Sequence, residues 1–269
     1  LGDVYKRQAQ FIDAIRDPDE RGRDPLSLLM LVVITFVGFL IHVYSVEFMW
    51  DDDGFARFFA YMNLFVASMA TLVLGANLLL LYLGWEGVGL CSYLLIGFWY
   101  KDPANGRAGR KAFVVTRVGD TAMAIGLLLL FRELGTLDIA ELLRRAAATW
   151  EPGSTMAIAA AALLLGGALG KSAQLPLLVW LPDAMAGPPP VSALSHAATM
   201  VTAGVYLLSR MGGVFLSAPD AMLVVAWLGA ITSLVGATMG VTQYNPVSYT
   251  HLRAHETHEP LVCRLLLDK

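Results

Sequence analysis

Residues 58–100 form a run of 43 residues with a single charged side chain, that of Glu86. Similar runs recur along the chain: residues 26–46 carry no charge, and residues 152–182 carry only Lys171. A helix needs roughly 20 apolar residues to cross the hydrocarbon core of a bilayer. The runs are also much longer than the alternating segments of about 10 residues that build membrane β-barrels. We therefore predict an all-α, polytopic helical membrane protein.

These runs predict about seven transmembrane helices. Residues 58–100 are long enough for two helices, hinged near residues 75–77, where Gly, Ala and Asn follow one another. Residues 152–182 exceed one crossing, and Pro176 is expected to break their helix because proline lacks the backbone N–H and clashes with the preceding turn. This predicts a discontinuous helix with Lys171 beside the break. The remaining crossings are expected at residues 26–46, 112–131, 191–209 and 221–242.

The two ends of the chain differ from this pattern. Only 15% of the residues are charged, yet 17 of the 41 charged residues lie in residues 1–25 and 246–269. The strings LGDVYKRQ at the start and VSYTHLRAHET near the end resemble translated sequencing-adapter sequence, which is excluded from fold reasoning. We expect a non-native or disordered segment at 1–25, a transmembrane helical domain at 26–245 and an artefactual tail at 246–269.

Net charge and cysteine content exclude several classes of function. The formal net charge is −3, so no basic surface for nucleic acid is expected. Two cysteines are too few for a disulfide framework or a sulfur-ligated metal. The sequence shows no nucleophilic triad in its required context. We expect this chain to bind no metal and no cofactor.

Ionisable side chains inside the runs are few, and each is a candidate for function because a buried charge is costly unless it is paired. Glu86 lies within GWEGVGLCSY, and Lys171 stands 20 residues after Glu151 and 12 before Asp183. Lys171 is thus too far from either water boundary to reach it easily. We expect a Glu–Lys pair that exchanges a proton when either partner moves. The alternative is a static ion pair that holds helices together.

Three further residues are candidates for the same path. His196 lies in a charge-free run of 26 residues and can exchange a proton near neutral pH, which predicts a relay between the buried sites. The alternative is a core histidine whose hydrogen bonds are satisfied. Arg117 and Asp120 are three residues apart, a spacing at which two side chains of one helix can pair. A structural ion pair and a role in tuning Glu86 are both open.

Four segments carry a resemblance to one family. They are LGWEGVGLCSYLLIGF at 83–98, KAFVVTRVGD at 111–120, GKSAQLPL at 170–177 and VWLPDAMAGPPPVSALSHAATMVTAGVYL at 179–207. With the residues around them, from 24 to 245, they resemble the antiporter-like subunit L of proton-pumping NADH:quinone oxidoreductase, respiratory complex I. The family's chain has two further helices before this region and about half of its spans after it. The resemblance therefore indicates an internal fragment with one half-channel.

The resemblance assigns a role to each candidate residue. Glu86 matches the essential glutamate of the fifth helix, Lys171 the central lysine of the broken seventh helix, and His196 the histidine of the eighth. Asp120 and Arg117 match polar residues of the sixth helix that tune the same channel. A proton is expected to pass among Glu86, Lys171 and His196.

The same resemblance implies proton translocation by a subunit of NADH:quinone oxidoreductase in the bacterial inner membrane. This chain would do no redox chemistry itself, because NADH, FMN, iron–sulfur clusters and quinone would be bound by other subunits. The expected partners are other membrane subunits of complex I and the lipid bilayer. Two alternatives stay open: a subunit of a multisubunit Na⁺(K⁺)/H⁺ antiporter, whose large subunits share the buried Glu and Lys, and a purely structural membrane subunit.

Overall fold

The computed structural model describes residues 25–242, without the side chains of residues 196–198 and 240–242, and this range forms helices and no strand. The longer helices are α2 (Pro25–Phe48), α3 (Phe55–Leu74), α4 (Leu78–Ile96), α5 (Pro103–Leu134), α7 (Thr155–Lys171), α9 (Met200–Arg210) and α11 (Pro219–Thr242). The shorter ones are α6 (Ile139–Thr149), η1 (Leu177–Trp180), η2 (Asp183–Ala186), α8 (Pro189–Ser192), the π-helical turn η3 (Ala193–Ala198) and α10 (Gly212–Leu216). The expected adapter-like ends lie outside the described residues.

The expected all-α membrane fold is confirmed. Six helical stretches in the described range are long and apolar enough to cross a membrane: α2, α3, α4, α5, Pro189–Arg210 and α11. The seventh expected crossing is the discontinuous one, in which α7 has 17 residues and is followed by two single turns, η1 and η2. The hinge expected at residues 75–77 separates α3 from α4.

Short polar side chains and glycine set several helix ends. Asn77 accepts a hydrogen bond from Leu80 N at 2.8 Å and begins α4, and Ser154 accepts one from Ala157 N and begins α7. Asp102 caps α5, with Pro103 in its first turn, so this helix begins nine residues before the expected start at 112. The basic residues Arg107, Arg110 and Lys111 therefore lie within α5. At its other end α5 stops at Gly135, which has φ 68°.

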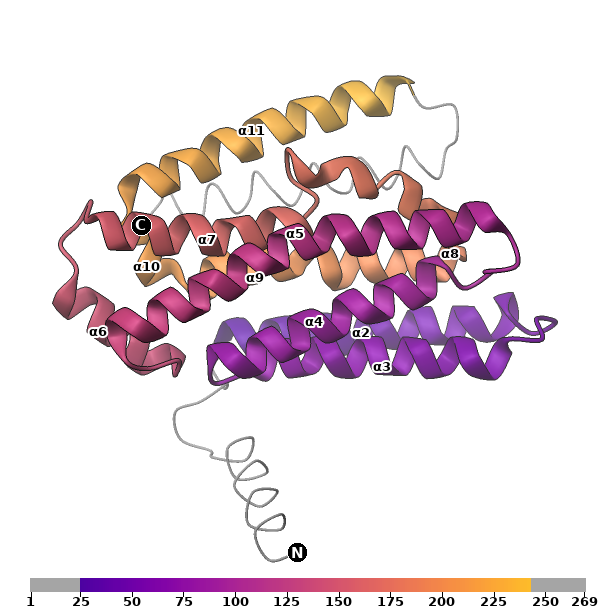
Figure 1. Ribbon diagram of the computed structural model, residues 1–269. Helices are drawn as coiled ribbons and strands as arrows, with labels where there is room; N and C mark the ends of the chain where they lie inside the picture. The colour runs from indigo at the N-terminus through magenta and orange to yellow at the C-terminus, as the bar shows by residue number, and fades with distance from the viewer. Residues whose placement is uncertain (1–24, 243–269) are drawn as a thin grey trace, which may run out of the picture.

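The long helices run roughly along a common direction, with α2 and α3 side by side at one edge and α11 at the opposite edge (Figure 1). Between these edges, α5 packs against both α4 and α7, and α7 packs against α9. Glycines allow the closest contact: a Cβ on Gly119 of α5 would lie 2.7 Å from Gly166 O and 3.0 Å from Gly170 Cα of α7. The glycines inside the α7 run therefore serve helix packing.

Large apolar side chains cover the outer faces of the bundle. On α2 they include Val32, Phe36 and Phe39, each more than half exposed, and on α11 Leu223 and Trp227. A water-soluble domain rarely exposes apolar surface on this scale, whereas helices in contact with lipid or with other membrane helices do. This exposure fits a multi-pass membrane protein.

Candidate functional site

The site is built around the end of α7. Lys171 is the last helical residue, and the backbone then turns through Ser172 and Ala173, which has φ 49°. The helix therefore stops five residues before Pro176, so the expected break exists but Pro176 lies beyond it, within the non-helical segment. The Ser172 hydroxyl donates to Val201 O at 2.7 Å and the Trp180 indole donates to Gly170 O at 3.0 Å. These bonds tie the buried C-terminal end of α7 to its neighbours.

Lys171 pairs with Asp120 of α5. Its Nζ lies 3.1 Å from Asp120 Oδ2, and the two side chains are 0% and 1% exposed. The other carboxylate oxygen, Asp120 Oδ1, accepts a hydrogen bond from the indole N–H of Trp85 at 2.6 Å. Two ionisable side chains that are this deeply buried are stable as ions only while their hydrogen bonds persist.

Gly89 of α4 provides the space for this pair. A Cβ at this position would lie 2.6 Å from Lys171 Nζ and 4.0 Å from Asp120 Oδ2. The side-chain ammonium therefore occupies the volume that any larger residue at position 89 would fill. The glycines around Glu86 can be read in the sequence as packing residues, but that reading does not single out Gly89.

A second ion pair lies beside the first. Arg117 of α5 forms a salt bridge with Glu86 of α4, and the Tyr82 hydroxyl donates to Glu86 Oε1 at 2.7 Å. This pair is less enclosed, with 39% of the Arg117 side chain and 21% of the Glu86 side chain exposed. Tyr82 also lies 3.4 Å from the backbone oxygen of Asp120, which brings the two ion pairs into one cluster.

The structure pairs the charged side chains differently from the expected Glu–Lys pair, since the partner of Lys171 is Asp120 rather than Glu86. Of the two alternatives left open for Arg117 and Asp120, their ion pair with each other does not form, and Arg117 contacts Glu86 instead. The reason is the packing of α5 between two helices: Arg117 finds its ionic partner on α4, while Asp120 finds its ionic partner on α7. Spacing along one helix shows which side chains can meet on that helix, but not which neighbour each one faces.

His196 lies in η3, the π-helical turn that interrupts the stretch from α8 to α9. Its side chain is outside the described residues, so its place in the relay stays a prediction. The turn is followed by Thr199, with φ −136° and ψ −78°, so the expected helix at 191–209 is irregular near the histidine. π-Helical turns are frequent at functional sites.

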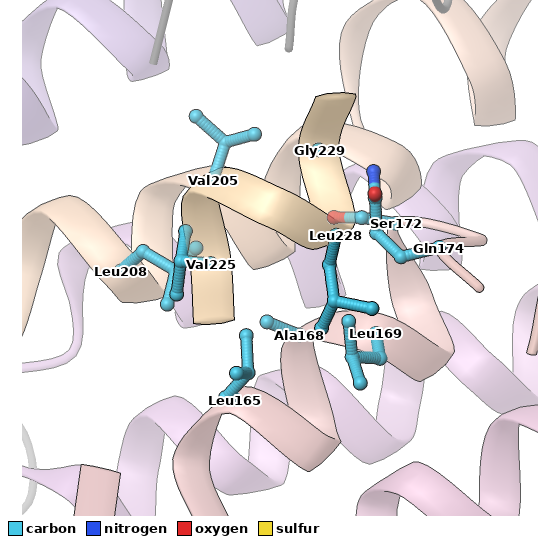
Figure 2. Close-up of a pocket in the computed structure, with 10 residues that line it drawn as sticks. All are labelled: Leu165, Ala168, Leu169, Ser172, Gln174, Val205, Leu208, Val225, Leu228 and Gly229. Carbon is cyan, nitrogen blue, oxygen red and sulfur yellow. The ribbon is translucent and has the colours of Figure 1, made fainter. Parts of the chain in front are cut away.

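An apolar pocket lies beside the break and is lined by side chains of α7, α9 and α11 (Figure 2). Its cavity volume is about 50 Å³, and it lies between the end of α7, α9 and α11. Ser172 and Gln174 are its polar side chains, and the rest of its lining is Leu165, Ala168, Leu169, Val205, Leu208, Val225, Leu228 and Gly229. Such a lining does not suit a charged ligand. Among the side chains that the structure describes, which exclude that of His196, no three His, Cys, Asp or Glu groups come together as a metal site would require.

Two family models match the chain. The model described as NADH:quinone oxidoreductase/Mrp antiporter, TM, matches residues 75–246, and the model of the N-terminus of complex I chain 5 matches residues 23–59. Together they span nearly the same range as the resemblance in the sequence.

Individual relatives agree with these models. The chain is 60% identical over 220 residues to NADH-quinone oxidoreductase subunit L of Escherichia coli K12 and 58% identical to that of Pseudomonas aeruginosa. Each alignment covers 82% of this chain and 36% of the relative, so the chain spans about a third of the length of the curated relatives it matches.

A solved structure is also similar. It is the Mrp complex from Dietzia sp. DQ12-45-1b, with a TM-score of 0.85 and 29% identity over 91% of this chain and 27% of that one. The membrane-spanning helices and the bacterial relatives indicate a multi-pass protein of the bacterial inner membrane. Since the first family model covers more than half of its residues, the chain belongs to the NADH:quinone oxidoreductase/Mrp antiporter transmembrane family.

Proposed function

We propose that this chain carries protons across the membrane as part of an antiporter-like subunit L of a bacterial NADH:quinone oxidoreductase. The observation that carries the proposal is the Lys171–Asp120 pair, which is fully buried at the end of a broken helix. A buried lysine that sits where the backbone can move is suited to hold a proton in one arrangement and release it in another.

The proposed step uses the cost of an unpaired charge. While Asp120 accepts from Lys171, the ammonium ion is stabilised by its partner. When the two groups separate, an isolated ammonium ion in an apolar environment is strongly disfavoured, so Lys171 releases its proton to an acceptor on its other side. The proposed acceptor is His196, which lies in the π-helical turn η3.

Glu86 is the proposed donor on the other side of the cluster. It is held by Arg117 and Tyr82, and Arg117 shares α5 with Asp120. A movement of α5 would therefore act on both ion pairs together. In this proposal Arg117 and Asp120 tune the proton affinities of Glu86 and Lys171 without being the carriers themselves.

The partial exposure of the Glu86–Arg117 pair is the reason to propose partners for this chain. A charged pair that is part-exposed on a membrane-spanning surface cannot face lipid tails without a large cost. We propose that other membrane segments of the complex or a water-filled path cover it. NADH, FMN, iron–sulfur clusters and quinone are proposed to bind other subunits, which drive this one.

The test uses a complete subunit L in an intact complex, in sealed membrane vesicles. Lys171→Met removes the ionisable group but keeps much of the side-chain volume, and it should abolish or sharply reduce NADH-driven proton translocation by this subunit. Lys111→Met is the matched control, because Lys111 pairs with Asp183 at an exposed site, and it should leave translocation near the parent level. Undiminished translocation with Lys171→Met would overturn the proposal.

Two rivals make different predictions. A Na⁺(K⁺)/H⁺ antiporter subunit would move protons in response to a cation gradient without NADH, and the similarity to the Mrp complex keeps this reading in view. The 60% identity to subunit L, against 29% to the Mrp chain, favours the first reading. If this chain is a purely structural subunit, the complex should keep translocating protons when Glu86 and Lys171 are both replaced by neutral residues.

A further inference from the structure

Trp85 touches both members of the buried ion pair. It lies on α4, next to Glu86 in the sequence, and its side chain is 0% exposed. Its indole N–H donates to Asp120 Oδ1 at 2.6 Å, while Lys171 Nζ donates to Asp120 Oδ2 at 3.1 Å. Each oxygen of the carboxylate therefore has its own donor, and the two donors come from different helices.

The indole ring also faces the cation. Lys171 Nζ lies 5.9 Å from the centre of the Trp85 ring, within the range in which the negative face of an aromatic ring attracts a cation. One turn further along α4, Gly89 leaves the space in which the ammonium group sits. The same helix thus contributes a hydrogen-bond donor to the anion, an aromatic ring to the cation and the space between them.

We propose that Trp85 is a positioning residue for proton transfer, which fixes the Asp120 carboxylate so that one oxygen stays directed at Lys171. This inference rests on the proposed function. An indole donor favours the ionised form of a carboxylate over the protonated form, because only the ionised form accepts the bond at full strength. Trp85 therefore helps to set the pH at which the pair exchanges a proton.

The same molecule contains a comparable contact outside the membrane spans. In the turn between α2 and α3, Asp52 Oδ2 accepts from the indole N–H of Trp99 at 2.9 Å. That bond is the main cause that holds the pKa of Asp52 below its usual range. Trp99 thus offers a matched control, since it makes the same chemical contact away from Lys171.

The experiment measures NADH-driven proton translocation against pH in vesicles that contain the complete complex, with rates expressed per assembled complex. Trp85→Phe keeps an aromatic ring but loses the donor, and it should move the midpoint of the pH profile upward by about one pH unit. Trp85→Gln keeps an uncharged N–H donor but loses the ring, and its midpoint should stay closer to that of the parent. Trp99→Phe should leave the midpoint unchanged.

Two results would overturn the inference. One is a Trp85→Phe profile with the parent's midpoint and rate. The other is a loss of rate by the same factor at every pH, which is what a packing role alone would produce. If Lys171→Met also translocates protons normally, the proposed function has failed; if Lys171→Met is inactive while the Trp85→Phe midpoint is unmoved, only the role of Trp85 has failed.

Discussion

Lys171 and Asp120 form an ion pair across the contact between α7 and α5, with Nζ and Oδ2 3.1 Å apart and almost no exposed surface on either side chain. A buried pair of this kind is not a gain in stability by itself, because removing two charges from water costs about as much as their attraction returns. A buried ion pair inside a membrane protein is therefore a candidate for function rather than for stabilisation. The pair can be tested as a unit.

Asp120→Asn should destabilise the protein by about 3 to 5 kcal/mol, because it leaves Lys171 buried without a negative partner. Asp120→Asn combined with Lys171→Met should recover a large part of that loss, since no unpaired charge remains. The unfolding of the purified complex, followed on the single and double variants, gives both values. Losses that simply add would show that the two side chains do not interact.

Gly89→Ala should impair proton translocation because it disturbs the Lys171–Asp120 pair. The added Cβ would lie 2.6 Å from Lys171 Nζ and push the ammonium group away from Asp120. The effect on α4 itself is small or favourable, since alanine suits a helix better than glycine by about 1 kcal/mol. Gly106→Ala on α5, where nothing lies within 4 Å of the new methyl group, is the control for translocation rate and unfolding temperature. Equal rates for the two variants would contradict the proposed position of the ammonium group.

Much of this architecture can be read from the sequence, because a hydrocarbon layer requires long apolar runs and tolerates few charges. The hinge at residues 75–77 and the break beside Lys171 both follow from such local patterns. These patterns do not predict the short amphipathic helix α6, because it is neither as long nor as apolar as a membrane-spanning helix.

The pairing of the charged side chains cannot be read in the same way. It depends on how each helix is rotated about its axis and on which neighbour it meets. Arg117 and Asp120 are close in sequence, but their ionic partners lie on different helices. Trp85 is uncharged, so a search for buried charges does not identify it as a partner of Asp120. The missing information is three-dimensional, and no spacing rule within one helix supplies it.

Arg117 should be energetically coupled to Glu86 and not to Asp120. A double-mutant cycle of Glu86→Gln and Arg117→Gln should give an interaction energy of about 0.5 to 3 kcal/mol, the range for side chains in contact. The cycle of Arg117→Gln with Asp120→Asn should give less than about 0.5 kcal/mol. Unfolding free energies of the single and double variants supply both cycles. A larger interaction energy for Arg117 with Asp120 than for Arg117 with Glu86 would contradict the observed pairing and favour an ion pair within α5.

Glu141 offers a pH-dependent test outside the membrane spans, in the first turn of α6. Hydrogen bonds from Arg144 and then Arg145 lower the pKa of Glu141 from 4.5 to about 2. Because the folded-state pKa is depressed, the stabilisation of α6 is fully present above about pH 4.5 and is lost as the pH falls toward 2. Backbone hydrogen exchange in α6, compared between the parent and Glu141→Gln, measures this. The parent should be better protected at pH 6 to 7, and its advantage should shrink steadily below pH 4.5. Added salt should also reduce the advantage, because the carboxylate and both guanidinium groups lie at the surface. An advantage that stays constant down to pH 3 would mean that the two arginines do not hold Glu141 in its ionised form.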